Sequence, residues 1–188
     1  MAPHSTNPPT STPSGRRDLI LAAALDVVAE EGAIRVTYRR IAAAAGVPLG
    51  SVTYYFDDLD QLLTEAFTRL AEKVSASYRA QLEAARTPEE ARDAVVDIMS
   101  GTLWTSDRDP LLTFELYAFA ARTPALRTVL NSWMQASRDA LARHFDPLTA
   151  RALDALVEGF TLHNFFDDTP IGRDDIAAVV QAVLDREI

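Results

Sequence analysis

Apolar side chains recur along nearly the whole chain after Arg16 at the 3.6-residue spacing of an α-helix. In the first such segment, Ile20, Ala24 and Val27 fall on one face. No stretch alternates convincingly with period two, and the Asn-Gly and Asp-Gly pairs that often join paired strands are missing. The pattern therefore predicts an all-α fold.

Helix starts in the second half are marked by a capping side chain followed by proline at the first helical position. Thr87-Pro88 is followed by Glu90, which completes a capping box. The same kind of pair recurs as Asp109-Pro110, Thr123-Pro124 and Asp146-Pro147, and Thr169-Pro170 with Gly172 marks another break. These signals and the apolar spacing predict nine helices, at residues 17–31, 38–45, 49–55, 59–85, 88–104, 110–121, 124–145, 147–166 and 173–187.

Composition narrows the class of protein. The chain has 188 residues, a formal charge of −9 and no cysteine, which fits a cytoplasmic protein without disulfides, thiolate nucleophiles or Cys-based metal sites. No apolar run approaches the roughly 18 residues of a membrane span, and we expect no signal peptide. Residues 1–15 hold four of the ten prolines and six Ser or Thr, so we expect them to form a disordered tail.

The charge is unevenly distributed along the chain. Residues 1–56 carry five arginines against four acids, a net charge of +1, whereas the remainder carries −10. Because binding of a polyanion depends on the local field at the contact face, any nucleic-acid face must lie near the N-terminus. Arginine supplies 17 of the 18 basic residues, so phosphate contacts are expected to use the bidentate guanidinium group.

The N-terminal helices are short and separated by a tight turn. Gly32 ends the first amphipathic helix, and Thr37 is placed to cap a second, short helix. That helix ends at Gly46, where a left-handed backbone costs least, and another helix begins three residues later. This is the helix-turn-helix arrangement, in which the second helix of the pair enters the DNA major groove.

Two runs of residues make this module more specific than a bare helix-turn-helix. They are Thr37-Tyr38-Arg39-Arg40-Ile41-Ala42 and Ala45-Gly46-Val47-Pro48-Leu49-Gly50-Ser51-Val52-Thr53-Tyr54-Tyr55-Phe56. With them, residues 20–63 resemble the DNA-binding domain of the TetR family of transcriptional regulators. After the tail expected over 1–15, the resemblance implies a helix-turn-helix DNA-binding domain over 16–57 and a ligand-binding and dimerisation domain over 58–188.

The resemblance also implies DNA-contact roles around the second and third helices. Thr37 would offer a helix N-terminus to phosphate, Gly50 would permit close approach, and Ser51 would reach base edges or phosphate. Arg16 and Arg17 would form an arm across the neighbouring backbone or minor groove. The implied contact residues are Arg16, Arg17, Thr37, Tyr38, Arg39, Arg40, Pro48, Leu49, Gly50, Ser51, Tyr54 and Tyr55, with packing as the alternative role for the last two.

Three positions depart from the common pattern of the family. Leu49 stands where the family often has lysine or another polar residue, and Thr53 stands where tyrosine is frequent. Leu59 replaces a frequent lysine. Fewer cations release fewer counterions, so we expect a shallow salt dependence of DNA binding, carried mainly by Arg39, Arg40 and hydroxyl donors.

The predicted helix 147–166 is apolar along two stripes. One stripe consists of Leu153, Leu156, Val157, Phe160 and Asn164, the other of Ala152, Ala155, Gly159, Leu162 and Phe166, and Arg151, Asp154 and Glu158 occupy the remaining sector. One stripe can cover its own core, and the one lined by small residues suits a partner helix. We expect that stripe to form a dimer interface together with Ile176, Val179, Val180 and Val183 of the last helix. The resemblance implies the same homodimer; a larger monomeric core is the alternative.

Aromatic residues and methionines gather in the middle helices. The resemblance implies a pocket there for a small inducer or co-repressor, and as a set these residues favour an aromatic or largely apolar ligand. The candidate ligand residues are Met99, Leu103, Trp104, Phe114, Tyr117, Trp133, Met134, Phe160, His163 and Asn164, and for each alone ordinary core packing is the alternative. His163 with Asp167 offers too few ligands for a metal, so no metal or cofactor is expected, and His163 is assigned to the pocket wall or to the dimer seam.

Together these features predict a homodimeric repressor that binds double-stranded operator DNA with palindromic sequence and leaves it when a small effector binds. An enzyme has no support, because no nucleophile elbow, phosphate loop or dinucleotide fingerprint is present. A helical interaction module with weakened DNA binding is the remaining alternative, and no membrane partner is expected.

Overall fold

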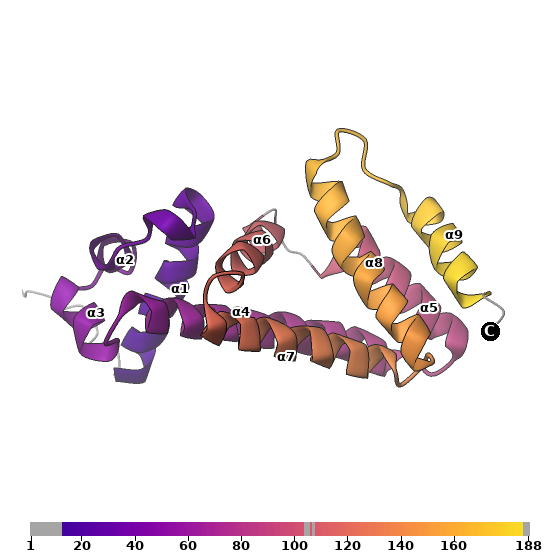
Figure 1. Cartoon of the computed structure of the whole chain (residues 1–188), viewed down its shortest axis with the longest axis horizontal. Helices are drawn as coiled ribbons and strands as arrows, with labels where there is room; N and C mark the ends of the chain where they lie inside the picture. Colours follow the sequence, from indigo (N-terminus) through magenta and orange to yellow (C-terminus); the bar gives the residue numbers. More distant parts are fainter. Residues whose placement is uncertain (1–12, 104–105, 107, 186–188) are drawn as a thin grey trace, which may run out of the picture. The chain divides into compact units, whose positions relative to one another are not determined.

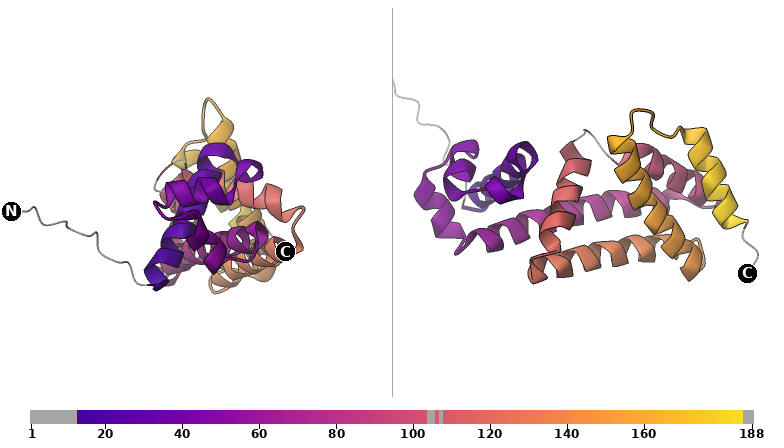
Figure 2. Two further views of the ribbon diagram at one scale, coloured as in Figure 1. Left: turned by 90° about the vertical axis from the view of Figure 1, so that its left-hand side faces the viewer. Right: turned by 45° about the horizontal axis from the view of Figure 1, so that its top comes forward.

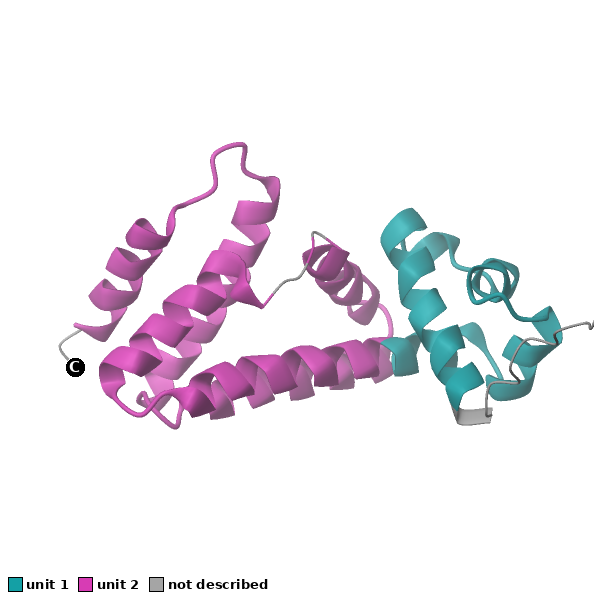
Figure 3. Cartoon of the chain, turned by 180° about the vertical axis from the view of Figure 1, so that it is seen from behind, with its two compact units in different colours: residues 1–66 teal, residues 67–188 magenta. Residues whose placement is uncertain are grey.

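A computed structural model describes residues 13–103, 106 and 108–185 of the chain. Over these residues the backbone forms nine α-helices and two short helical segments and contains no strand, so the predicted all-α fold is confirmed (Figure 1). The chain divides into two compact units, Met1–Ala66 and Phe67–Ile188 (Figure 3). The division falls inside helix α4 (Leu59–Ala84), later in the chain than the expected boundary after residue 57. Within the described part, no helix is long and apolar enough to cross a bilayer.

The first unit is a small bundle built around α1 (Pro13–Glu31), α2 (Tyr38–Ala44) and α3 (Leu49–Tyr55). A short segment, η1 (Ala33–Arg35), follows α1. Helix α2 packs against both α1 and α3. The core is closed by apolar side chains from all of these helices and from the start of α4, namely Ile20, Ala24, Val28, Ile41, Val52, Phe56, Leu62 and Leu63.

Helix α1 starts earlier than the sequence predicts. Its first residue is Pro13, so residues 13–15 are helical and the expectation that they belong to the disordered tail is wrong. Proline is favoured at the first helical position, because the N–H that it lacks would have no partner within the helix. The rest of the predicted tail, residues 1–12, lies outside the described residues.

The second unit continues α4 and adds α5 (Pro88–Asp97), η2 (Ile98–Thr102), α6 (Arg108–Ala120), α7 (Pro124–Leu141), α8 (Pro147–Phe166) and α9 (Arg173–Leu184). Helix α7 packs against α6 and α8, and α9 packs against α5 and α8 (Figures 1 and 2). The buried core of this unit includes Leu82, Val95, Met99, Leu141, Leu153, Ile176 and Val180.

Local capping signals account for several helix starts of this unit. The Thr87 side chain accepts a hydrogen bond from the Glu90 N–H, and Asp146 accepts from the N–H groups of Leu148 and Thr149. Thr123 stands at the N-cap of α7 without a side-chain capping bond.

Three predicted helix boundaries in this unit differ from the structure, and the first is the end of α7, which lies at Leu141 and not at residue 145. The helix predicted over 88–104 ends at Asp97, and the chain continues through η2, where Gly101 adopts φ +93°. A helix cannot pass through that left-handed conformation. Helix α6 begins at Arg108, so Asp109-Pro110 lies within its first turn and does not mark its cap.

Candidate nucleic-acid interface and ligand pocket

The turn between α2 and α3 is fixed by a left-handed glycine. Gly46 has φ +63°, and its N–H donates to the Ala43 carbonyl at 3.2 Å. The N–H of Val47 donates to the Ala42 carbonyl at 3.0 Å, which completes a Schellman motif. This local geometry ends α2 and starts α3 after only four residues.

Helix α3 has one buried and one exposed face. Val52 is 0% exposed and Phe56, which follows the helix, is also buried. The opposite face carries Leu49, Gly50, Thr53 and Tyr54, all exposed, and the Tyr54 side chain is 81% accessible. The predicted contact residue Pro48 is exposed as well, whereas Ser51 and Tyr55 are half-buried. The helix therefore presents a continuous outward face of hydroxyl, aromatic and aliphatic groups.

The start of α2 is held against the end of α3. Thr37 caps α2 by accepting from the Arg40 N–H at 3.3 Å. The Tyr38 hydroxyl donates to the Phe56 carbonyl at 3.4 Å, and burial raises the pKa of Tyr38, with the carboxylates of Asp58 and Asp57 adding to the shift. Tyr38 is therefore occupied in joining the two helices.

The arginine side chains of this unit differ in whether they form ion pairs within the unit. Arg39 is exposed, whereas Arg40 forms an ion pair with Glu31 and donates to the Arg35 carbonyl at 3.1 Å. Arg17 forms an ion pair with Glu65. The predicted arm is therefore wrong for Arg17, because its guanidinium is held inside the unit; Arg16, also part of α1, is half-buried.

The Arg17 guanidinium also lies over the ring of Phe56, with 4.8 Å between its carbon and the ring centroid. A cation in this position is attracted by the negative face of the ring. Arg17 thus connects α1 to Phe56, which follows α3, and to Glu65 of α4. It acts as a structural residue of the unit.

The predicted ligand residues do not form one pocket. Met99 is buried in the core, Phe160 packs against that core, and Phe114 stacks with Phe166 and meets Phe165 edge to face. Three of the other predicted residues, Leu103, Tyr117 and Met134, are half-buried. Trp104 lies outside the described residues.

Two predicted polar ligand residues serve other roles. His163 is exposed, so the structure does not place it in a pocket wall, and its place at the dimer seam stays a prediction. The Asn164 side chain accepts a hydrogen bond from the Ile171 N–H at 3.1 Å and orders the turn after α8.

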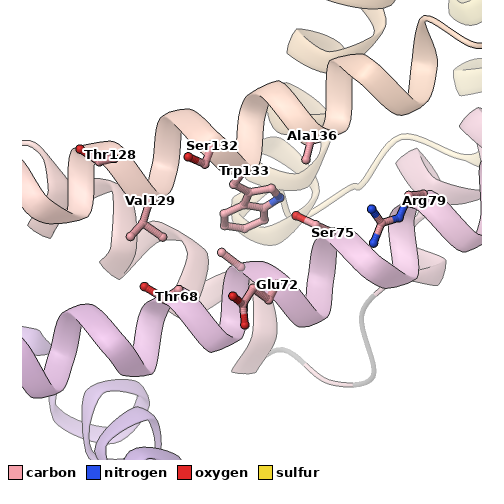
Figure 4. A pocket seen from close by; sticks show the side chains of 10 residues that line it. Thr68, Glu72, Ser75, Arg79, Thr128, Val129, Ser132, Trp133 and Ala136 are labelled. Atoms are coloured by element: carbon pink, nitrogen blue, oxygen red, sulfur yellow. The ribbon is translucent and has the colours of Figure 1, made fainter.

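A groove of about 470 Å³ lies between α4 and α7 (Figure 4). Side chains of α4 and α7 face one another across it, with the Trp133 ring between the two helices. Trp133 is the predicted ligand residue that lines this groove, together with Thr68, Ala71, Glu72, Ser75, Arg79, Thr128, Val129, Ser132 and Ala136. The α4 residues were missed because a helical pattern gives no sign of which distant helix faces them.

A second, closed space lies deeper in this unit. Its volume is about 20 Å³, enough for about one water molecule. Two predicted ligand residues, Trp133 and Leu103, belong to its wall, together with Tyr78 of α4 and Glu158 of α8. The charged sector of α8 is thus divided, since Arg151 is exposed while Asp154 is only 8% exposed and Glu158 is partly buried.

The expected dimer residues separate into two groups. On α8, Ala155, Leu162 and Phe166 are exposed and Ala152 and Gly159 are half-buried. Leu148, which is also exposed, extends this stripe toward the start of the helix.

On α9 the expectation is wrong at two positions. Ile176 and Val180 are fully buried in the core of their own unit and cannot contact a partner. Val179 and Val183 are half-buried, because α9 turns this face toward α5 and α8.

The fold and the outward face of α3 define a helix-turn-helix DNA-binding protein with a separate helical domain. Comparison with known proteins gives the family. Residues 20–66 match the profile described as bacterial regulatory proteins, tetR family, and residues 90–186 match that of the tetracyclin repressor-like C-terminal domain. The chain belongs to the TetR family of transcriptional regulators, so it is a regulator and not an enzyme.

Individual relatives agree with this assignment. The crystal structure of the transcriptional regulator SCO7518 from Streptomyces coelicolor A3(2) is 48% identical, covers 91% of this chain and 99% of its own, and superposes with a TM-score of 0.84. The multidrug binding protein EbrR complexed with ethidium is 34% identical, with 89% and 98% coverage and a TM-score of 0.74. The regulator PksA of Bacillus subtilis is 26% identical over 176 residues, 88% of this chain and 86% of PksA.

Proposed function

We propose that the chain is a homodimeric repressor that leaves a palindromic operator when a small aromatic effector binds its second unit. The observation that carries the proposal is the exposed face of α3, which presents Leu49, Gly50 and Tyr54 behind a rigid Schellman turn. A recognition helix must expose such a face to reach base edges in the major groove. Arg39 adds a free guanidinium for phosphate.

A second copy of the chain is the expected partner of α8. Its stripe of Leu148, Ala152, Ala155, Gly159, Leu162 and Phe166 repeats at intervals of three and four residues along the whole helix. The three large side chains are exposed, with Phe166 at 68%. An exposed apolar stripe of this length marks an interaction surface, and small residues in its middle permit close approach of a partner helix. A two-fold dimer would present two copies of α3 to one operator.

The effector is expected in the groove between α4 and α7. Its volume lies within the range of small-molecule sites, and its wall contains a tryptophan ring. EbrR, the multidrug binding neighbour, has been crystallised with ethidium, proflavin and malachite green, all aromatic compounds. Residues 68–79 of α4 line the groove, and the same helix begins in the first unit, so a ligand that favours one position of α4 would change operator affinity.

Titration of the purified protein against labelled duplexes from the DNA flanking its own gene tests this proposal. Fluorescence anisotropy should show specific binding, weakened about tenfold by Arg39→Ala through loss of a guanidinium contact. Arg86→Ala, which removes an exposed arginine from the second unit, is the matched control and should bind like wild type. Added proflavin should lower the operator affinity. Binding unaffected by both Arg39→Ala and proflavin would contradict the proposal.

The alternative of an interaction module with weakened DNA binding has one observation in its favour. Two of the five arginines before residue 57, Arg17 and Arg40, form ion pairs within the first unit. This alternative predicts no specific complex with any flanking duplex in the same titration, so one experiment separates the two functions.

A further inference from the structure

A carboxylate without a cationic partner lies in the interior of the second unit. Glu158 of α8 lines the closed space of about 20 Å³, and it accepts a hydrogen bond from the Tyr117 hydroxyl. Asp154, one turn earlier, has Arg138 at 3.5 Å. Among the described residues, no basic side chain forms an ion pair with Glu158. A largely buried carboxylate in such a position lacks the compensation that buried charges in proteins usually have.

A second polar group of the same space lacks a well-formed hydrogen bond. The Tyr78 hydroxyl is buried and forms no hydrogen bond of normal geometry in the described part of the chain, although the Ser137 side chain lies close to it, and Tyr78 is only 4% exposed. Leaving a buried hydroxyl unpaired costs about 1 to 3 kcal/mol. A buried polar group of this kind usually has a hydrogen-bond partner, such as a water molecule, an ion or a ligand. Tyr78 and Glu158 both line the closed space, so a single donor group placed there would satisfy both.

The electrostatics of this space favour positive charge. Burial raises the pKa of Glu158, and the nearby carboxylate of Asp154 raises it further. Burial and the two carboxylates also raise the pKa of Tyr78. A cation placed between these groups would relieve both penalties, whereas an anion would increase them.

The aromatic wall indicates an organic cation and not a metal ion. Trp133 lines both the closed space and the open groove, and a tryptophan face is the best aromatic partner for a cation. Within the described residues, no group of three or more His, Cys, Asp or Glu could hold a metal. In the closed space the ligand would meet one carboxylate, hydroxyl groups and an indole ring, and the open groove adds Glu72 and Arg79.

We propose that Glu158 is the counter-ion for an aromatic cation that binds in the groove between α4 and α7 and reaches Glu158 past Trp133. The closed space alone is too small for a ligand, but the groove beside it has the volume of a small-molecule site. Because Trp133 lies in the wall of both, movement of its ring would join them. The charged nitrogen of the ligand then lies between Glu158 and the Tyr78 hydroxyl, and its ring system stacks on Trp133. This assignment rests on the proposed effector response and names the chemical class of effector.

Direct binding without DNA tests the assignment. Proflavin is a three-ring cation near neutral pH, and acridone is a neutral molecule with the same ring frame. Isothermal titration should show that proflavin binds the wild-type protein at least tenfold more tightly than acridone. Glu158→Gln keeps the shape and the hydrogen bond from Tyr117 but removes the charge, and it should abolish this preference. Glu89→Gln makes the same change at an exposed carboxylate of α5 that lines neither the groove nor the closed space, and it should change proflavin binding less than threefold.

The outcomes of these titrations separate two failures. If Glu158→Gln leaves the preference for proflavin unchanged, or if wild-type protein binds neither probe, the assignment is overturned. If proflavin binds through Glu158 but operator affinity does not change, the site stands and the proposed effector response fails. Thermal denaturation of Glu158→Gln provides the folding control, and a melting temperature at or above that of wild type is expected because a buried charge is removed.

Discussion

Replacing Glu31 by glutamine should make operator binding more sensitive to salt. In the structure Arg40 forms an ion pair with Glu31, and Arg17 forms one with Glu65. Because their charges are already compensated, we do not count either arginine among the cations that displace counterions from the DNA phosphates. Of the four arginines expected to contact DNA, Arg16 and Arg39 remain, which gives four phosphate-neutralising cations in a dimer. The expected slope of log K against log salt is then about −3.6, or a loss of affinity of about 150-fold between 50 and 200 mM salt.

Glu31→Gln frees Arg40 in both subunits and brings the number of cations to six. The slope should steepen to about −5.4, and the loss over the same salt range should reach about 1,800-fold. Glu30→Gln is the matched control, because it removes a neighbouring exposed carboxylate and leaves the Arg40 pair in place. Anisotropy titrations at four or more salt concentrations measure the three slopes. Equal slopes for Glu31→Gln and Glu30→Gln would refute the reasoning that the ion pair withholds Arg40 from DNA.

Three further predictions concern the recognition helix, the dimer and the buried carboxylate. Gly50→Ala should raise the free energy of unfolding by roughly 0.5 to 1 kcal/mol, because alanine favours the helix and nothing lies within 4 Å of the added methyl group. The same methyl group should weaken operator binding about tenfold, because it holds the backbone away from DNA. Unchanged operator affinity would contradict the role of Gly50. Leu162→Glu should yield monomers in sedimentation velocity while Ile34→Glu, a matched change at an exposed position of the first unit, stays dimeric; a dimeric Leu162→Glu protein would exclude the α8 stripe. The raised pKa of Glu158 means that the folded state keeps the proton of this carboxyl to higher pH than the unfolded state does, so the stability of the wild-type protein falls as pH rises through that range. Between about pH 4 and pH 7, the free energy of unfolding of Glu158→Gln, measured by urea denaturation, should therefore rise relative to that of wild type. A difference that stays constant with pH would contradict this.

Features set by residues close together in the chain could be predicted from the sequence. The caps Thr87 and Asp146, the left-handed turn at Gly46 and the outward face of α3 depend on neighbours within a few positions. The helix-turn-helix is such a local unit, so its fold and its exposed positions were predictable. Gly101 is an exception, because a single glycine inside a helical pattern does not reveal whether the helix continues through it.

Features that join distant segments could not be predicted in the same way. Arg17 and Glu65 are 48 residues apart, and no spacing rule indicates that they meet. The helical pattern of α8 places Glu158 in a polar sector but does not say that Tyr78 and Tyr117 face it. For the same reason Ile176 and Val180 were assigned to a partner, whereas α5 and α8 of their own unit cover α9. Periodicity gives the faces of a helix, and the tertiary structure decides what each face meets.

The central claim is that two copies of α3 lie in successive major grooves of one operator. Methylation interference on a bound flanking duplex tests it most directly, because it reports guanine N7 in the major groove and adenine N3 in the minor groove. The account predicts two clusters of interfering guanines on one face of the duplex, with centres about one helical turn apart or a multiple of it. A single cluster, or interference confined to adenine N3, would contradict the account.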